Sequence, residues 1–183
     1  GYGEMLKHGL LEGDAAIDRL LSLNPLTDTA QLLGTIRDSV EVKARVVAED
    51  LRESGTRKLL NLGHTFGHAF ESFSYERGTP AAHGYAVVWG LVCELVLSHM
   101  RHGFPSVLLY KIRNYVREHY GAFAITCNDY PALIHAMRHD KKNASSDSIN
   151  CTLLHKPGLG LTDEVVSEDE IKSALDIYRD LML

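Results

Sequence analysis

Residues 57–71 read RKLLNLGHTFGHAFE, and this stretch decides how the rest of the chain is organised. Within it, the helical spacing i, i+4, i+7 and i+11 relates four polar residues: Arg57, Asn61, His64 and His68. That spacing places side chains on one face of a helix, where core-facing helices usually carry leucine or isoleucine. Leucines and phenylalanines occupy the other sides, so we expect a buried helix whose polar face requires a metal, other charges or a ligand. We therefore predict a central helix from Arg57 to about Phe73 that forms the wall of an active site.

Two glycines, Gly63 and Gly67, lie inside this predicted helix. Each costs a helix interior roughly 1 kcal/mol relative to alanine. We expect that another backbone or a ligand approaches the helix closely at these positions.

The composition excludes several classes of protein. The chain has 183 residues and a formal net charge of -5, which suits one domain with a sizeable core and argues against a nucleic-acid partner. Three scattered cysteines, Cys93, Cys127 and Cys151, imply no disulfide framework. Glu94 and His99 interrupt the longest apolar run, so we expect no membrane span. We recognise no signal peptide and expect a cytoplasmic location.

The rest of the chain reads as helices separated by glycine, proline and asparagine, with one β hairpin near the C-terminus. The expected helices cover about 1–11, 14–23, 28–52, 83–102, 106–120, 131–140 and 168–182. A strand at 148–155, the turn at 158–160 and a short return strand form the hairpin. In the helix over 28–52, the apolar candidates are Leu32, Leu33, Ile36, Val40, Val47 and Leu51. We predict one mostly helical domain spanning residues 1–183.

Taken singly, the polar residues have ordinary explanations. His64 and His68 form an HxxxH pair, which on a helix can hold one metal ion. They can equally be two buried, hydrogen-bonded imidazoles, because the pattern is common by chance in a chain with ten histidines. His83 can be a helix cap, and Glu4 beside Lys7 can be a solvated ion pair. These alternatives stay open on the residues alone.

Taken together, four segments resemble a known family. They are GYGEMLKHG (1–9), the run SVEVKARVVAEDLRESGTRKLLNLGHTFGHAFE (39–71), AHGYAVVWG (82–90) and DKK (140–142). In this order they resemble the C-terminal half of 3-dehydroquinate synthase, a sugar-phosphate cyclase distantly related to metal-dependent polyol dehydrogenases. The resemblance runs from the first residue to the last, and it implies the helical C-terminal domain of the dehydroquinate synthase-like fold.

The resemblance implies a role for each matching position. One divalent metal ion, zinc or cobalt, would be held by Glu4, His64 and His83. The catalytic residues would be His68, Glu53 and Lys7. The substrate-binding residues would be Lys43, Arg57, Asn61, His68 and Lys141.

The resemblance also implies a reaction. The family converts 3-deoxy-D-arabino-heptulosonate 7-phosphate to 3-dehydroquinate plus phosphate, by transient oxidation with NAD, phosphate elimination, re-reduction and intramolecular aldol closure. This is a step of the shikimate pathway, and the family is generally homodimeric. The family's N-terminal NAD-binding α/β domain has no counterpart in these residues, and no strand here is followed by a GxGxxG loop. We expect a piece of a longer protein that is inactive alone.

Three other interpretations remain. The chain can belong to another sugar-phosphate cyclase, one that makes an inosose or a valiolone, but Arg57 and Lys43 favour a substrate with a carboxylate. It can belong to a metal-dependent polyol dehydrogenase, which would need fewer cations. It can also be a non-catalytic helical metal-binding or interaction module.

Overall fold

The computed structural model describes residues 1–24, 26–140 and 148–183. The elements run in the order α1 (Tyr2–Glu12), α2 (Asp14–Leu21), α3 (Thr29–Glu49), the 3₁₀-helix η1 (Thr56–Asn61), α4 (His64–Glu76), α5 (His83–His102), α6 (Ser106–Tyr120), the 3₁₀-helix η2 (Cys127–Asp129), α7 (Tyr130–Arg138), β1 (Ile149–Lys156), β2 (Leu159–Val166) and α8 (Glu168–Met182). The prediction of a mostly helical chain with a C-terminal hairpin is confirmed. No helix in the described part is both long and apolar enough to cross a membrane.

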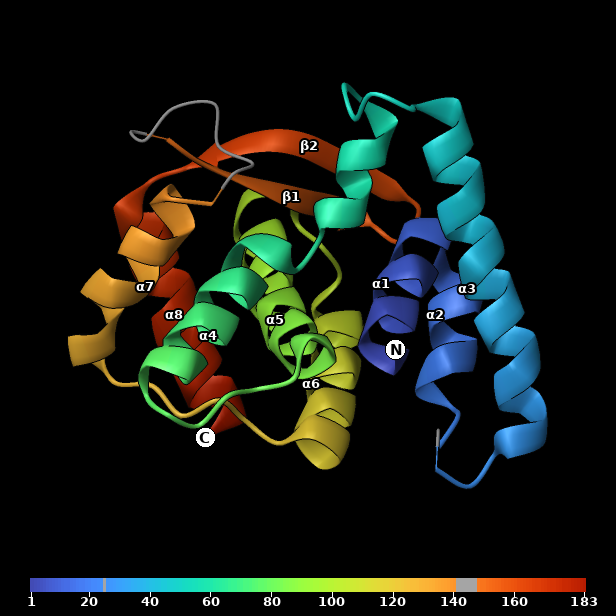
Figure 1. The fold of residues 1–183 in the computed structure, drawn as a ribbon, viewed down its shortest axis with the longest axis horizontal. Coiled ribbons are helices and arrows are strands. Elements are labelled where there is room, and N and C mark those ends of the chain that lie inside the picture. The colour runs from blue at the N-terminus through green and yellow to red at the C-terminus, as the bar shows by residue number, and fades with distance from the viewer. Residues whose placement is uncertain (25, 141–147) are drawn as a thin grey trace.

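Helix α5 lies at the centre of the molecule, with helices and the hairpin packed around it (Figure 1). Every residue from Ala86 to Ser98 is buried, as expected for a helix that is apolar on nearly all sides. Helices α1, α4, α6 and α8 and strand β1 all contact α5. In Figure 1, α1, α2 and α3 form one flank of the molecule, whereas α7 and α8 lie on the other. The first residue of this central helix is His83.

The predicted central helix over residues 57–73 is wrong in one respect, because it is two elements. The 3₁₀-helix η1 ends at Asn61, and α4 begins at His64. Between them Gly63 adopts the left-handed conformation, with φ 80°, which side chains other than glycine rarely tolerate. The expectation of a close approach is confirmed, since a Cβ atom on Gly67 would lie 3.1 Å from the carbonyl oxygen of Ala86 in α5.

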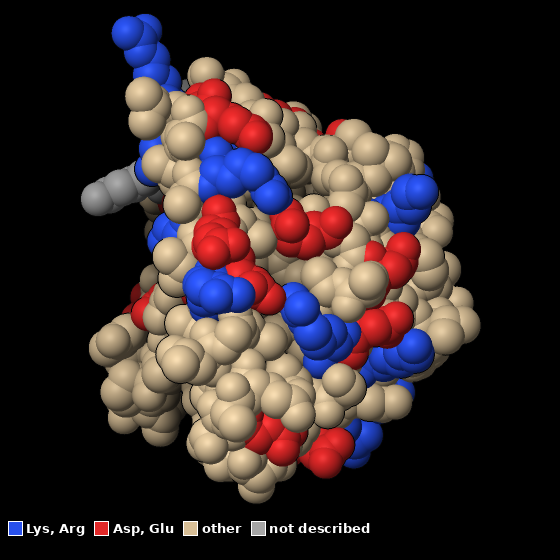
Figure 2. All heavy atoms as spheres, turned by 90° about the vertical axis from the view of Figure 1, so that its right-hand side faces the viewer, with Lys and Arg blue, Asp and Glu red and all other residues tan. Residues whose placement is uncertain are grey.

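The predicted core face of the helix over 28–52 is also wrong. Helix α3 ends at Glu49 and turns its small buried face, Thr35, Val42 and Val46, towards the rest of the molecule. The apolar candidates lie largely outside: Leu33 74% exposed, Ile36 42%, Val40 61% and Leu51 75%, with Leu32 and Val47 half-buried. Helix α3 packs on α1 and η1 along one narrow strip, and apolar periodicity alone does not reveal which strip is covered. Figure 2 shows this flank, where Lys and Arg are interspersed with Asp and Glu over large uncharged areas.

The hairpin closes one end of the molecule. Strands β1 and β2 pair antiparallel, from Ile149 opposite Val166 to Lys156 opposite Leu159. Strand β1 packs on α5 and η1, and Thr152 Oγ1 donates a hydrogen bond to the carbonyl of Lys58 at 3.1 Å. The hairpin therefore supports η1, the segment that carries two of the candidate substrate-binding residues.

Candidate metal centre and its pocket

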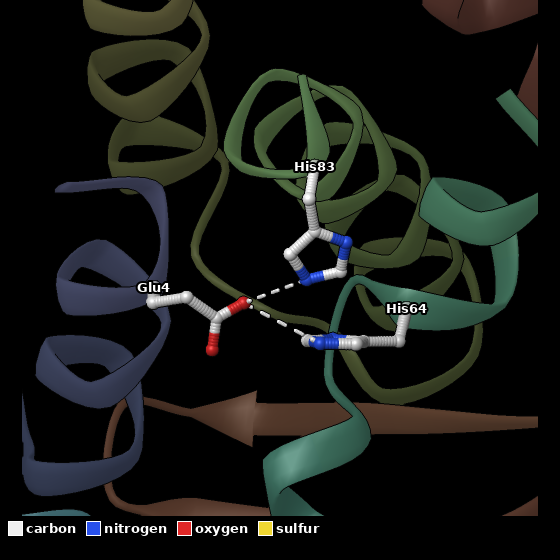
Figure 3. A group of neighbouring side chains, drawn as sticks. All are labelled: Glu4, His64 and His83. Carbon is white, nitrogen blue, oxygen red and sulfur yellow. Dashed lines mark ion pairs between the residues drawn. The ribbon is translucent and has the colours of Figure 1, made fainter. Parts of the chain in front are cut away.

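Three side chains from three helices meet at one point: Glu4 of α1, His64 of α4 and His83 of α5 (Figure 3). One potential ligand atom from each lies within 4.8 Å of the other two. Glu4 Oε1 lies 3.4 Å from His64 Nε2 and 3.6 Å from His83 Nε2. Glu4 lies in the first turn of α1, and the two histidines are the first residues of their helices. The packing of α1 and α4 against α5 thus brings together residues that lie far apart in the sequence.

Each histidine ring is fixed through its other nitrogen. His64 Nδ1 lies 3.1 Å from the carbonyl oxygen of Leu62, and His83 Nδ1 lies 2.9 Å from Glu71 Oε2. A carbonyl or carboxylate oxygen can only accept, so Nδ1 is the donor in both rings. A neutral ring then presents the lone pair of Nε2 towards Glu4. Metal-bound histidines in proteins are commonly oriented in this way.

The two oxygens of the Glu4 carboxylate have different neighbours: one contacts Lys7, and the other faces His64 and His83. Oε2 accepts a hydrogen bond from Lys7 Nζ at 2.6 Å, whereas Oε1 is buried and has no hydrogen-bond donor in the described part of the chain. Burial raises the pKa of Glu4, but the His64 ring and the Lys7 ammonium outweigh it and hold the pKa well below its ordinary value. A buried anionic oxygen beside two imidazole nitrogens suits Zn²⁺ or Co²⁺, and three protein ligands leave positions for substrate.

A pocket of about 390 Å³ opens beside this centre. It is lined by Glu4, Lys7, Lys43, Glu53, Arg57, Leu60, Asn61, His64 and His83. The structure therefore gathers most of the predicted site residues around one cavity. Lys7 is only 3% exposed, and its ammonium also donates to the carbonyl of Leu60 at 2.8 Å.

His68 lies one turn after His64 on α4, outside the lining of that pocket. Its ring centroid is 5.3 Å from that of His64 and 5.9 Å from that of His83. Its Nδ1 lies 2.8 Å from Asp140 Oδ2, so this ring too is held by a carboxylate. The predicted substrate ligand Lys141 lies outside the described residues.

Glu53 and Arg57 are presented by a turn that Asp50 organises. The Asp50 carboxylate accepts backbone N–H groups of Gly55 at 2.7 Å, Ser54 at 3.1 Å and Arg57 at 3.2 Å. The hydrogen bonds from Ser54 and Gly55 are the main reason that the pKa of Asp50 is lowered to about 2. Glu53 lies within this turn, in the left-handed conformation with φ 54°. The turn thereby holds Glu53 and Arg57 at the rim of the pocket.

Two polar contacts complete the rim. Asn61 Nδ2 donates to Glu53 Oε1 at 3.2 Å, and the Arg57 Nη1 atom donates to the carbonyl of Leu51 at 3.1 Å. Arg57 Nε also lies 3.9 Å from Glu53 Oε2. A guanidinium has five N–H donors in a planar fork, which suits bidentate binding of a carboxylate.

Sequence reasoning missed the carboxylates that support these residues: Asp50, Glu71, Glu94 and Asp140. Asp50 carried a local signal, because its partners are backbone amides only four to seven residues later in the chain. Glu71 carried one as well. It follows His64 and His68 at i+7 and i+3, which places all three on adjoining parts of one helix face. The partners of Glu94 and Asp140 lie on separate elements, so the sequence pattern could not reveal these two carboxylates.

The fold is similar to solved sugar-phosphate cyclase structures. A 2-deoxy-scyllo-inosose synthase complexed with carbaglucose-6-phosphate, NAD⁺ and Co²⁺ superposes with a TM-score of 0.70 at 20% identity, covering 97% of this chain and 49% of that one. ValA, the 2-epi-5-epi-valiolone synthase from Streptomyces hygroscopicus subsp. jinggangensis 5008 with NAD⁺ and Zn²⁺ bound, gives 0.70 at 18% identity, covering 97% and 50%. At these identities the likeness shows the fold.

Sequence relatives are more similar. A 3-dehydroquinate synthase from Parabacteroides distasonis is 42% identical over 182 residues, covering 98% of this chain and 51% of the relative. One from Leptospira interrogans is 36% identical over 179 residues, covering 96% and 48%. The chain thus spans about half the length of the curated relatives it matches. The family described as 3-dehydroquinate synthase C-terminal matches residues 1–143. Because that match covers most of this chain, the chain belongs to the 3-dehydroquinate synthase C-terminal family.

Proposed function

We propose that this chain is the metal- and substrate-binding half of a 3-dehydroquinate synthase. Such an enzyme converts 3-deoxy-D-arabino-heptulosonate 7-phosphate to 3-dehydroquinate and phosphate, and in it a separate half would bind NAD. The observation that carries the proposal is the meeting of Glu4, His64 and His83 beside a pocket whose lining includes Lys7, Lys43 and Arg57. The structurally similar cyclases were solved with NAD⁺ and Co²⁺ or Zn²⁺, which supports the same cofactors here.

The charges of the pocket suit this substrate. The heptulosonate phosphate has a carboxylate at one end and a phosphate at the other, and both call for Arg, Lys or His. Lys43 and Arg57 line the pocket from α3 and η1, so they can bind an anionic group next to the metal centre. Asn61 can donate to or accept from a substrate hydroxyl. Lys141 is proposed as a further cation on the grounds of the family resemblance.

Each residue of the site has a separate proposed role in the reaction. A divalent ion bound by Glu4, His64 and His83 would polarise substrate hydroxyl groups and lower their pKa. Lys7 holds the Glu4 carboxylate so that Oε1 remains directed at the two rings. His68 is the proposed proton-transferring residue near the leaving phosphate, and the contact of its Nδ1 with Asp140 holds the ring in one orientation. Glu53 is the second proposed acid or base.

We expect this chain of 183 residues, assayed on its own, to have no cyclase activity. The proposed reaction needs NAD for its oxidation and re-reduction, and the sequence has no glycine-rich pyrophosphate loop after a strand. Phosphate release from the heptulosonate phosphate should stay at background with NAD and Zn²⁺ present, while the Parabacteroides distasonis enzyme in the same assay is active. Cyclisation by the chain alone would refute this expectation.

Arg57 provides the test between this function and another sugar-phosphate cyclase. We expect the Zn²⁺-loaded chain to bind the heptulosonate phosphate more tightly than glucose 6-phosphate, which lacks a carboxylate. Arg57→Ala should weaken binding of the heptulosonate phosphate by about 10- to 100-fold, as befits loss of a charged hydrogen-bonding partner. Binding of glucose 6-phosphate should change little. Calorimetric titration measures both ligands.

Arg37→Ala is the matched control, because Arg37 is an exposed arginine of α3 paired with Asp38 and Glu41 outside the pocket. It should leave both affinities unchanged. If Arg57→Ala weakens both ligands equally, or if the wild type prefers glucose 6-phosphate, the carboxylate assignment fails and a different cyclase is favoured.

A further inference from the structure

Glu94 is a carboxylate in the middle of the central helix α5, with 0% of its surface exposed. It faces the start of α4. Its Oε2 accepts the backbone N–H of Gly63 at 2.6 Å, and its Oε1 accepts the backbone N–H of Thr65 at 3.0 Å. These two amides belong to the residues on either side of His64. One buried side chain therefore accepts hydrogen bonds from the backbone amides immediately before and after a candidate metal ligand.

A carboxylate in the middle of a buried helix is unfavourable unless its oxygens are hydrogen-bonded, because burying a charged or polar group costs free energy. From Ala86 to Leu97 the other buried residues of α5 are apolar or glycine. Helix α4 has Gly63 at its N-cap position and therefore no side-chain cap of its own. Glu94 supplies the missing acceptors from a neighbouring helix, and its charge complements the positive end of α4.

The contact fixes two metal-binding helices relative to each other. His64 is the first residue of α4, and His83 is the first residue of α5, the helix that also carries Glu94. Because Glu94 of α5 bonds the amides on both sides of His64, the Cα atom of His64 cannot move independently of α5. The hydrogen bond from Nδ1 to the carbonyl of Leu62 then sets the rotation of the ring. Together these contacts define where Nε2 of His64 lies.

We propose that Glu94 is a positioning residue that sets His64 against His83 and Glu4 for metal binding. The inference rests on the proposed function, because it assumes that these three residues hold a divalent ion. It also adds to that function a residue that touches neither metal nor substrate. Supporting groups behind metal ligands typically change affinity by about 10- to 100-fold when they are replaced.

The test is Co²⁺ titration of the metal-free chain, followed by the visible absorption of the bound ion. Glu94→Gln keeps the length of the side chain but replaces one acceptor oxygen by an NH₂ donor, which opposes one of the two amides. We expect about 10-fold weaker Co²⁺ binding and an altered visible spectrum. Ser98→Ala is the matched control. Ser98 is also buried in α5. Its Oγ donates to the carbonyl of Glu94 at 2.6 Å and accepts from the amide of Leu154 at 3.0 Å, and neither of these hydrogen bonds involves α4.

Ser98→Ala should lose stability yet keep the wild-type spectrum and Co²⁺ affinity within about 2-fold. Equal Co²⁺ affinity and spectrum in Glu94→Gln and Ser98→Ala would overturn the positioning role while leaving the metal centre intact. Failure of the wild type to bind Co²⁺ would instead overturn the proposed function. If Glu94→Gln does not fold, Glu94→Asp keeps the charge on a shorter side chain and is titrated in its place. If neither folds, Glu94 serves the fold itself and the proposal is wrong.

Discussion

Replacement of Glu4, His64 or His83 by alanine is expected to weaken Zn²⁺ binding by more than about 100-fold, whereas His68→Ala should bind like the wild type. A direct ligand should matter more than its supporting group, whose loss costs about 10- to 100-fold. The ligand atoms of the first three residues lie within 4.8 Å of one another, and among the described residues His68 contributes no ligand atom to this group. The measurement is a competition titration of the chelated chain against a chromophoric zinc indicator.

The structure also predicts a graded result for Glu71→Gln. Glu71 Oε2 lies 2.9 Å from His83 Nδ1, and an amide can keep one hydrogen bond there but not the negative charge. We expect Zn²⁺ affinity to fall by about 10-fold, between the wild type and the ligand variants. This order, with Glu71→Gln in the middle, separates loss of a supporting group from loss of a ligand.

His135→Ala is a suitable control for removal of a histidine, because His135 is exposed on α7 and lies outside the metal centre. Its Zn²⁺ affinity should match the wild type. Circular dichroism of each metal-free variant checks that the fold is retained. If His64→Ala and His68→Ala lose the ion while Glu4→Ala and His83→Ala keep it, the HxxxH pair is the metal site and the assignment from the family is wrong.

The sequence alone could not choose between these two metal sites. His64 and His68 are one turn apart, and their ring centroids lie 5.3 Å from each other, which is as close as the 5.5 Å between His64 and His83. What distinguishes the pairs is the direction of the ring nitrogens. That direction depends on Leu62, Glu71 and Asp140, which are contacts made only after folding. The family resemblance supplied Glu4 and His83, which no local pattern connects to His64.

The elements of the fold were predictable where apolar periodicity and turn residues agree. The helices expected over 83–102 and 168–182 are examples, and both are present with these bounds. The break at Gly63 was not predictable, because i, i+4, i+7 spacing is compatible with one continuous helix. The covered face of α3 was not predictable either, since Val40 is as apolar as the buried Val42. Both outcomes depend on neighbouring elements.

Gly90→Ala should destabilise the fold strongly. Among the glycines where α4 and α5 meet, we expect it to lower the free energy of unfolding the most. A Cβ atom on Gly90 would lie 2.5 Å from the backbone nitrogen of Gly67 and closer still to the carbonyl oxygen of Gly63. Backbone atoms cannot rotate away as a side chain can, so α4 must move as a whole. Overpacking in cores costs typically 1–3 kcal/mol and occasionally more, and we expect a loss of about 3 kcal/mol in the free energy of unfolding.

Helix propensity alone predicts the opposite sign, because alanine in a helix interior is favoured over glycine by about 1 kcal/mol. Gly34 of α3 allows the effect of helix propensity to be measured without overpacking, since a Cβ atom there has nothing within 4 Å. Gly34→Ala should therefore raise the free energy of unfolding by up to about 1 kcal/mol. Urea unfolding of the two variants and the wild type measures both changes on one scale.

The displacement of α4 also predicts a functional consequence for Gly90→Ala. His64 begins α4, and the amides beside it are held by Glu94 of α5, so a shift between the helices must disturb both contacts. We expect weaker Zn²⁺ binding in Gly90→Ala under conditions where the variant remains folded, and wild-type binding in Gly34→Ala. A Gly90→Ala variant as stable as Gly34→Ala would show that α4 and α5 do not approach so closely. The geometry of His64 derived from that contact would then be wrong as well.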